Sequence, residues 1–337
     1  GTEGVRPWLV VLTLLAAAIG VFEAYLFGLL GSVVDWIAKT EPSRLWEQER
    51  AHLLALAALL GGSVALIALQ TAVKHQALAG NFPMRLRWNF HRLMLRQSMG
   101  FYQDEFAGRI STKVMQTSLA VRDTWIIVAD LLVFVIIYFV TMLALLGGFD
   151  AWLLVPFVGW LAFYVAALAY FVPRLGRLAR DQADARSMMT GRMTDAYTNI
   201  ATVKLFSHAR REAAFARAAM GEFLGTVQGQ MRLVTGFEIV NHALSMGLIA
   251  STAGATLWLW SKGQIGVGAV AASTAMALRL NGISHWVMWE MASLFENIGI
   301  VQDGINTIAR PHAVVDRPDA KPLVVTEGDI RFERVSF

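Results

Sequence analysis

Apolar residues gather in six stretches along the chain, separated by segments that are rich in polar and charged residues. Each stretch is long enough to cross a hydrocarbon core about 30 Å thick, which takes roughly 20 helical residues. The stretches cover residues 8–37, 52–72, 124–146, 152–171, 234–260 and 267–289. The pattern therefore predicts an all-α membrane protein with six long transmembrane helices.

The composition supports this interpretation. Hydrophobic residues make up 56% of the 337 residues and charged residues only 16%, whereas about 25% of a soluble globular chain is charged. The excess apolar surface has to face lipid. The chain contains no cysteine, which excludes disulfides, cysteine-ligated metal centres and thiol catalysis.

Positive charge is unevenly distributed among the connections. Three connections are short, residues 38–51, 147–150 and 261–266, and two are long, residues 73–123 and 172–233. Most arginines and lysines lie in the two long ones, and an excess of these residues marks the cytoplasmic side of a membrane. We therefore expect both long connections and both termini to be cytoplasmic. Acidic residues are interleaved with the basic ones, so topology explains the charge better than nucleic-acid binding does.

The two long connections have helical rather than loop-like sequences. Their apolar and charged residues are spaced as on amphipathic helices, so the transmembrane helices are expected to continue into the cytoplasm. Residues 52–99 would form one helix about 72 Å long, kinked at Pro83. Breaks at residues 100–108 and 196–201 predict two elbows, each joining two long helices. An elongated bundle with ordinary turns is the alternative.

Ionisable residues inside a span normally face the bundle interior, where they line a pathway or pair with one another. Glu23 lies near the middle of the first stretch, and Arg279 near the middle of the sixth. At 3.6 residues per turn, a narrow face continues from Arg279 along the sixth helix, and its tryptophans suit bulky or cationic amphiphiles. The predicted substrate path comprises Glu23, Arg279, His285, Trp286, Trp289, Glu290, Ser293 and Asn297. An internal Glu23–Arg279 salt bridge that only orients helices stays open.

Three short segments carry recognisable patterns. Residues 99–123 contain paired aromatics, an acidic residue, a glycine and a helix ending in Val-Arg-Asp, and residues 202–212 contain Val-Lys-x-Phe followed by a glutamate. Residues 328–337 read Gly-x-Ile-x-Phe-x-x-Val-x-Phe. In this order the three segments resemble the transmembrane half of ATP-binding cassette (ABC) exporters, of the six-helix kind found in bacterial multidrug and lipid exporters, and the resemblance covers essentially the whole chain.

The resemblance implies two parts. Residues 1–311 would be the six-helix transmembrane domain with its cytoplasmic extensions, and residues 312–337 a linker and the first strand of a nucleotide-binding domain that is otherwise absent. The chain contains no Gly-x-x-x-x-Gly-Lys-Ser/Thr phosphate-binding loop. ATP and Mg²⁺ would therefore be bound by the missing domain, and no residue of this chain is expected to be catalytic or to bind a metal. We expect the chain to be the membrane half of a larger machine.

By the same resemblance, a second half-transporter chain packs against this one around a central cavity. The two elbows would transmit closure of the nucleotide-binding domains to the spanning helices, which alternate between inward-facing and outward-facing states. The implied coupling residues are Phe101, Tyr102, Asp104, Phe106, Tyr197, Thr198, Asn199 and Ile200. Asp104 and either Thr198 or Asn199 are also suited to cap helices at the elbows. A bacterial plasma (inner) membrane is the expected location.

The implied substrate is a hydrophobic or amphipathic compound, either drug-like or lipid, moved out of the cytoplasm or the inner leaflet. A lipid flippase or an importer on the same fold is one alternative. A motorless secondary transporter or membrane scaffold is another. Secondary transporters often contain broken helices at mid-membrane, and Pro156 is the only proline inside these spans, so that signature is weak. Homodimer and heterodimer both stay open.

Overall fold

The computed structural model describes residues 4–40, 45–104, 107–206, 209–315, 319–321, 324 and 328–335, and nearly all of them are helical. No strand occurs in these ranges. The elements are α1 (Arg6–Lys39), α2 (Leu45–Ala72), η1 (Val73–Ala79), α3 (Asn81–Met94), α4 (Met99–Asp104), α5 (Ala107–Ile126), η2 (Ile127–Leu132), α6 (Val133–Phe149), η3 (Ala151–Leu153), α7 (Leu154–Thr198), α8 (Ile200–Leu205), α9 (Ala209–Ser261) and α10 (Val267–Ile308). The predicted all-α class is confirmed.

The described residues contain five helices that are long and apolar enough to cross a membrane. They are Arg6–Lys39, Trp46–Met94, Ile110–Phe149, Ala151–Ala179 and Arg210–Ser261. The sixth predicted span lies in α10, which is 42 residues long but carries Arg279 and Asn281 among its apolar residues. Polar residues of this kind lower the hydropathy of α10, so its role as a sixth span stays a prediction.

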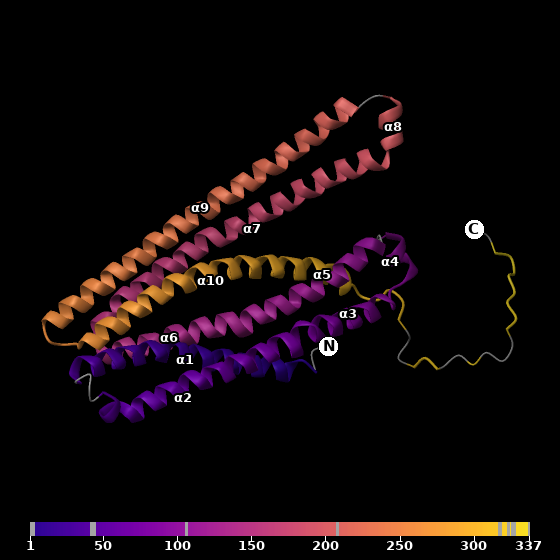
Figure 1. Cartoon of the computed structure of the whole chain (residues 1–337). Coiled ribbons are helices and arrows are strands. Elements are labelled where there is room, and N and C mark those ends of the chain that lie inside the picture. Colours follow the sequence, from indigo (N-terminus) through magenta and orange to yellow (C-terminus); the bar gives the residue numbers. More distant parts are fainter. Residues whose placement is uncertain are drawn as a thin grey trace.

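The long helices form two units, which Figure 1 shows side by side. In one unit, α7 and α9 run together as a long hairpin that diverges from the rest of the bundle and bears α8 at its tip. The other unit contains α1, α2, α3, α5 and α6, with α4 at the far end of α3 and α5 (Figure 1). Helix α10 packs against both units. At 1.5 Å per residue, the 53 residues of α9 span about 80 Å, so the expected long helical extensions are present.

The path from α2 to α3 departs from regular α-helix at η1, a π-helical segment that ends four residues before Pro83. Proline has no N–H, so the carbonyl of Ala79, four residues earlier, lacks its usual helical donor. The Arg122 guanidinium donates a hydrogen bond to that carbonyl over 3.1 Å. The helix is therefore distorted rather than stopped at Pro83, as the sequence predicts.

Helix α3 ends at Met94 and not at residue 99, so the expected 52–99 helix is five residues too long. Other donors meet its last carbonyls. The Tyr102 hydroxyl donates to the carbonyl of Met94 over 2.7 Å, and the backbone N–H of Arg96 donates to Leu93. These donors satisfy carbonyls that have no helical partner once the helix ends.

The buried core is aromatic between the two units. The rings of Trp160 and Tyr164 on α7 stack with centroids 4.9 Å apart, and the Tyr164 hydroxyl donates to the carbonyl of Ser284 on α10 over 2.5 Å. A buried aromatic hydroxyl of this kind needs such a partner. The contact therefore fixes α7 against α10 at one height.

Helices α1 and α10 cross where both have glycine. A Cβ on Gly31 would lie 2.7 Å from the carbonyl oxygen of Gly268, too close for any side chain. Beside this crossing, the Asp35 carboxylate accepts a hydrogen bond from the Gly268 N–H over 2.9 Å. A carboxylate at a helix N-terminus is favourable because it satisfies a free N–H and faces the positive end of the helix dipole. Asp35 of α1 thus caps α10.

Residues 328–335 form neither helix nor strand. A strand needs a neighbouring strand to receive its hydrogen bonds. The expected first strand of a nucleotide-binding domain, and with it the domain boundary at residue 312, stays a prediction.

Candidate functional site

Glu23 and Arg279 form an ion pair between α1 and α10. Arg279 Nη2 donates to Glu23 Oε2 over 2.6 Å. The Glu23 side chain is 28% exposed and the Arg279 side chain 40%. Both line a cavity of about 490 Å³ between α1, α2 and α10. The salt bridge considered from the sequence is therefore present, and it lies on the wall of a cavity.

The remaining polar residues of the α10 face lie further along the helix. Trp286 Nε1 donates to Glu290 Oε1 over 3.2 Å, and Asn297 Nδ2 donates to the Ser293 hydroxyl over 3.4 Å. The indole of Trp286 also lies 6.3 Å from the ring of Phe134 on α6. None of these four α10 residues lines the Glu23–Arg279 cavity. The structure thus divides the predicted face into two parts: the Glu23–Arg279 ion pair, and a separate strip that contains Trp286, Glu290, Ser293 and Asn297.

His285 lies beside this strip and faces α9. Its Nδ1 is 3.5 Å from Asn241 Nδ2, and its Nε2 is 3.8 Å from Glu238 Oε1. Trp289, the other flanking residue, is 46% exposed. His285 therefore joins α10 to α9, while Trp289 leaves a large apolar surface uncovered in this chain.

The two elbows differ in how their side chains are placed. In the first, Phe101 is buried against Met94, Ile110 and Ile308, while Tyr102 is partly exposed and bonds to the end of α3. Asp104 is the last residue of α4, and Phe106 lies outside the described residues. Phe101 is thus a packing residue that ties the elbow to α5 and α10.

In the second elbow, all four predicted residues are exposed: Tyr197, Thr198, Asn199 and Ile200. Asn199 lies between the last residue of α7 and the first residue of α8, and its Nδ2 donates to the carbonyl of Asp195 over 3.0 Å. It satisfies a carbonyl at the end of α7 instead of an N–H at the start of α8. The second elbow therefore presents a free surface at the tip of the α7–α9 hairpin (Figure 1).

Comparison with known proteins identifies the family. Residues 9–283 match the model of the ABC transporter transmembrane region. The chain belongs to the ABC transporter transmembrane family. A protein of Haemophilus influenzae, described as an uncharacterized ABC transporter ATP-binding protein, is 53% identical over 335 residues, which are 99% of this chain and 54% of the relative. The chain thus spans about half the length of this curated relative.

The fold agrees with this assignment. The structure of a bacterial Atm1-family ABC exporter with ATP bound superposes with a TM-score of 0.72 at 17% identity, covering 96% of this chain and 57% of the exporter chain. This ABC transporter domain therefore has the transmembrane fold of an ABC exporter and is an integral membrane protein.

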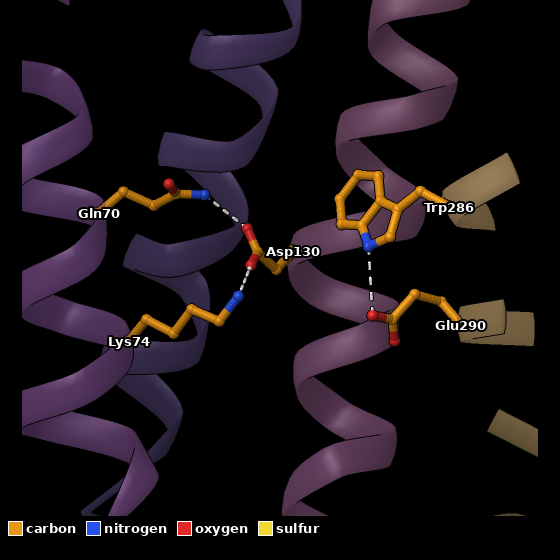
Figure 2. Close-up of polar contacts among 5 residues, drawn as sticks. All are labelled: Gln70, Lys74, Asp130, Trp286 and Glu290. Carbon is orange, nitrogen blue, oxygen red and sulfur yellow. Dashed lines mark hydrogen bonds and ion pairs between the residues drawn. The ribbon is translucent and has the colours of Figure 1, made fainter. Parts of the chain in front are cut away.

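One polar cluster of the ABC transporter domain was not singled out from the sequence. Asp130, in η2, accepts a hydrogen bond from Gln70 Nε2 over 2.5 Å and pairs with Lys74 Nζ over 2.6 Å. Figure 2 shows both side chains reaching the Asp130 carboxylate, one to each oxygen. Asp130 lies within the predicted third span, so the rule that picked out Glu23 and Arg279 would have found it.

This cluster joins the two π-helical segments. Lys74 lies in η1 and Asp130 in η2, and π-helical turns occur frequently at functional sites. Ile127 and Leu131 of η2 pack against Leu294 of α10. The segment that holds the Lys74 ion pair therefore also supports the α10 helix, close to its Trp286–Glu290 strip (Figure 2).

Proposed function

We propose that this chain is the membrane-spanning part of an ATP-driven ABC exporter that moves hydrophobic or amphipathic compounds out of the cytoplasm or the inner leaflet. The observation that carries the proposal is the exporter-type arrangement of α1–α10, which superposes on an ABC exporter along nearly all of this chain. The proposal includes α10 as the sixth span, both termini on the cytoplasmic side, and a bacterial inner membrane as the location.

The energy source in this proposal lies in nucleotide-binding domains, which bind ATP and Mg²⁺. Two transmembrane halves assemble around a shared path, and the tips of the two long helical units contact the nucleotide-binding domains. The exposed residues of the second elbow support this part of the proposal, because Tyr197 and Ile200 offer apolar surface at the end of a hairpin about 68 Å long. A helix of that length transmits a displacement at its tip into the membrane.

The side chains proposed to line the path lie on α10 and α1. The Trp286–Glu290 strip supplies a flat apolar ring beside a carboxylate, which suits an amphiphile with a cationic group through cation–π and charge-assisted contacts. Alternating access requires this strip to face first one side of the membrane and then the other. Its partial exposure in a single chain is consistent with a surface completed by a second half.

The test is transport by the complete protein in proteoliposomes. Fluorescent amphiphiles and labelled lipids are offered on the side that exposes the nucleotide-binding domains, with ATP and Mg²⁺ or with ADP. We expect ATP-dependent movement of at least one compound. A variant lacking the lysine of the phosphate-binding loop is the matched control and should move none. Equal movement with ATP and ADP would contradict the proposal, as would ATP hydrolysis that moves no compound of the panel.

A further inference from the structure

The cavity that contains the Glu23–Arg279 ion pair has a mostly apolar lining. Three of its side chains are polar, Glu23 on α1, Ser63 on α2 and Arg279 on α10, and all others are apolar. Its volume of about 490 Å³ lies in the range of roughly 300–1,000 Å³ typical of small-molecule sites. The cavity is thus an apolar pocket that offers one carboxylate and one guanidinium.

The cavity lies at an exposed edge of the helical bundle in this chain. It lies at the seam between α1 and α2, and α2 is at the edge of the bundle in Figure 1. None of the residues in the apolar part of α2 is buried. In this chain, the seam beside Ser63 and Ile67 can therefore be reached without crossing the packed core.

The two charges restrict which ligand fits. Their sum is zero, so a ligand with a net charge leaves one charge unpaired in apolar surroundings, which is unfavourable. A zwitterion avoids this, because its cationic group can pair with Glu23 and its anionic group with Arg279. The bond from Arg279 Nη2 to Glu23 uses one of five guanidinium N–H donors, so donors are left for an anionic oxygen.

We propose that the cavity between α1, α2 and α10 binds zwitterionic amphiphiles, with the apolar chain between α1 and α2 and the headgroup at Glu23 and Arg279. This inference rests on the proposed transport function, for which it names the substrate class. The shared chemistry covers zwitterionic phospholipids of the bilayer and free zwitterionic amphiphiles that enter from water.

The experiment measures equilibrium binding to the complete protein, without nucleotide, in nanodiscs of phosphatidylglycerol. Four fluorescent probes have hydrocarbon chains of equal length and differ in headgroup: lysophosphatidylethanolamine as zwitterion, lysophosphatidic acid as anion, an alkylammonium as cation and a monoacylglycerol as neutral. We expect the zwitterion to bind at least about tenfold more tightly than the other three, because only it pairs both charges. Equal affinities across the four probes would overturn the inference.

The variants are tested for their preference among the differently charged probes. A salt bridge that only orients helices would not control this preference. Glu23→Gln should shift the preference to the anion, and Arg279→Gln should shift it to the cation. The exchange Glu23→Arg with Arg279→Glu keeps the pair and should keep the zwitterion preference. Ile67→Trp fills the cavity and should weaken all probes. Glu47→Gln and Arg50→Gln, exposed residues at the start of α2, are matched controls and should change nothing.

If Glu23→Gln and Arg279→Gln fold and leave the order of affinities unchanged, the inference is wrong. If either variant fails to fold, the double variant Glu23→Arg with Arg279→Glu and the variant Ile67→Trp decide. Loss of the zwitterion preference in the double variant, or an unchanged affinity in Ile67→Trp, contradicts the inference. Replacing phosphatidylglycerol with phosphatidylethanolamine distinguishes the two sources of ligand. If phosphatidylethanolamine of the bilayer competes with the zwitterionic probe, the ligand is a bilayer lipid; if it does not compete, the ligand is a free amphiphile. Charge-selective binding without ATP-driven transport would refute the proposed function and leave the cavity as a ligand site.

Discussion

The guanidinium of Arg122 takes the place of the backbone donor that Pro83 removes, because it bonds to the carbonyl of Ala79 over 3.1 Å. A helix that loses a donor at a proline exposes the carbonyl four residues earlier, and here a side chain from α5 satisfies it. The distortion between α2 and α3 is therefore supported from a neighbouring helix.

Arg122→Leu should lower the free energy of unfolding by about 1–2 kcal/mol, because it leaves the Ala79 carbonyl without a partner. In a Pro83→Ala background the cost should be smaller, since alanine restores the N–H. Thermal unfolding of the parent protein, the two single variants and the double variant, all in the same detergent, measures this double-mutant cycle. Arg122 also contacts Asp123 over 2.8 Å, so Asp123→Asn is the control; equal costs of Arg122→Leu in both backgrounds would refute the explanation.

Asp130→Asn should destabilise the domain by about 1–2 kcal/mol, because it leaves Lys74 partly buried and unpaired. Asp130 is 13% exposed and Lys74 35%, so the effect should be smaller than for a fully buried pair. The double variant Lys74→Met with Asp130→Asn should recover part of the loss. The exposed Asp303, which pairs with Lys113 over 3.0 Å, is the comparison, and Asp303→Asn should shift the melting temperature much less.

Gly268→Ala should be strongly destabilising, by about 1–3 kcal/mol, because the new methyl group would overlap the backbone of α1 at Gly31. Gly61→Ala is the control, since its Cβ would meet nothing within 4 Å and alanine favours a helix. Melting temperatures of the two variants should therefore move in opposite directions. A neutral Gly268→Ala would show that α1 and α10 can separate at this crossing without cost.

Tyr102→Phe should lower transport several-fold relative to ATP hydrolysis in the complete protein. The change removes the hydrogen bond that ties α4 to the end of α3, so the elbow loses its orientation while nucleotide binding is untouched. The ratio of transported molecules to hydrolysed ATP measures the effect. Tyr25→Phe, at an exposed position of α1, is the matched control. An unchanged ratio in Tyr102→Phe would remove this bond from coupling.

Trp286→Ala should reduce substrate-stimulated ATP hydrolysis of the complete protein by about tenfold, because it removes the aromatic surface of the proposed path. Glu290→Gln should reduce stimulation mainly by cationic compounds. Both are measured as the increase in the rate of ATP hydrolysis over a range of substrate concentrations. Trp46→Ala, at an exposed position near the start of α2, should have no effect. If Trp286→Ala and Glu290→Gln both respond like the parent protein, the strip is not part of the path.

Much of the fold could be predicted because its signals are local. Apolar runs long enough for a membrane and amphipathic spacing along α3, where Phe82, Leu86 and Met94 are buried, determine helices without knowledge of the neighbours. The end of α3 could not be placed from the sequence, because the donors that meet its last carbonyls, such as the Tyr102 hydroxyl at Met94, arrive only after the chain has turned.

The candidate site was predicted only in part for the same reason. A charge inside an apolar stretch is visible in the sequence, which is why Glu23 and Arg279 were found and Asp130 could have been. Which charges meet depends on helix packing. Periodicity placed Arg279 and Trp286 on one face of α10, but it could not show that α1 and α2 enclose a cavity around the former while Phe134 approaches the latter.

The crossing at Gly31 and Gly268 has a mechanical consequence. The two backbones are in contact there and Asp35 caps the start of α10, so the crossing fixes the separation of α1 and α10 at this end of α10. Gly268 lies at one end of α10, and Ile308 at the other end is about 60 Å away at 1.5 Å per residue. A rotation of about 5° at the crossing therefore displaces the far end by about 5 Å. A small change in the angle between α1 and α10 at the glycine contact would thus become a displacement of several ångströms beside the first elbow, where Ile308 packs against Phe101.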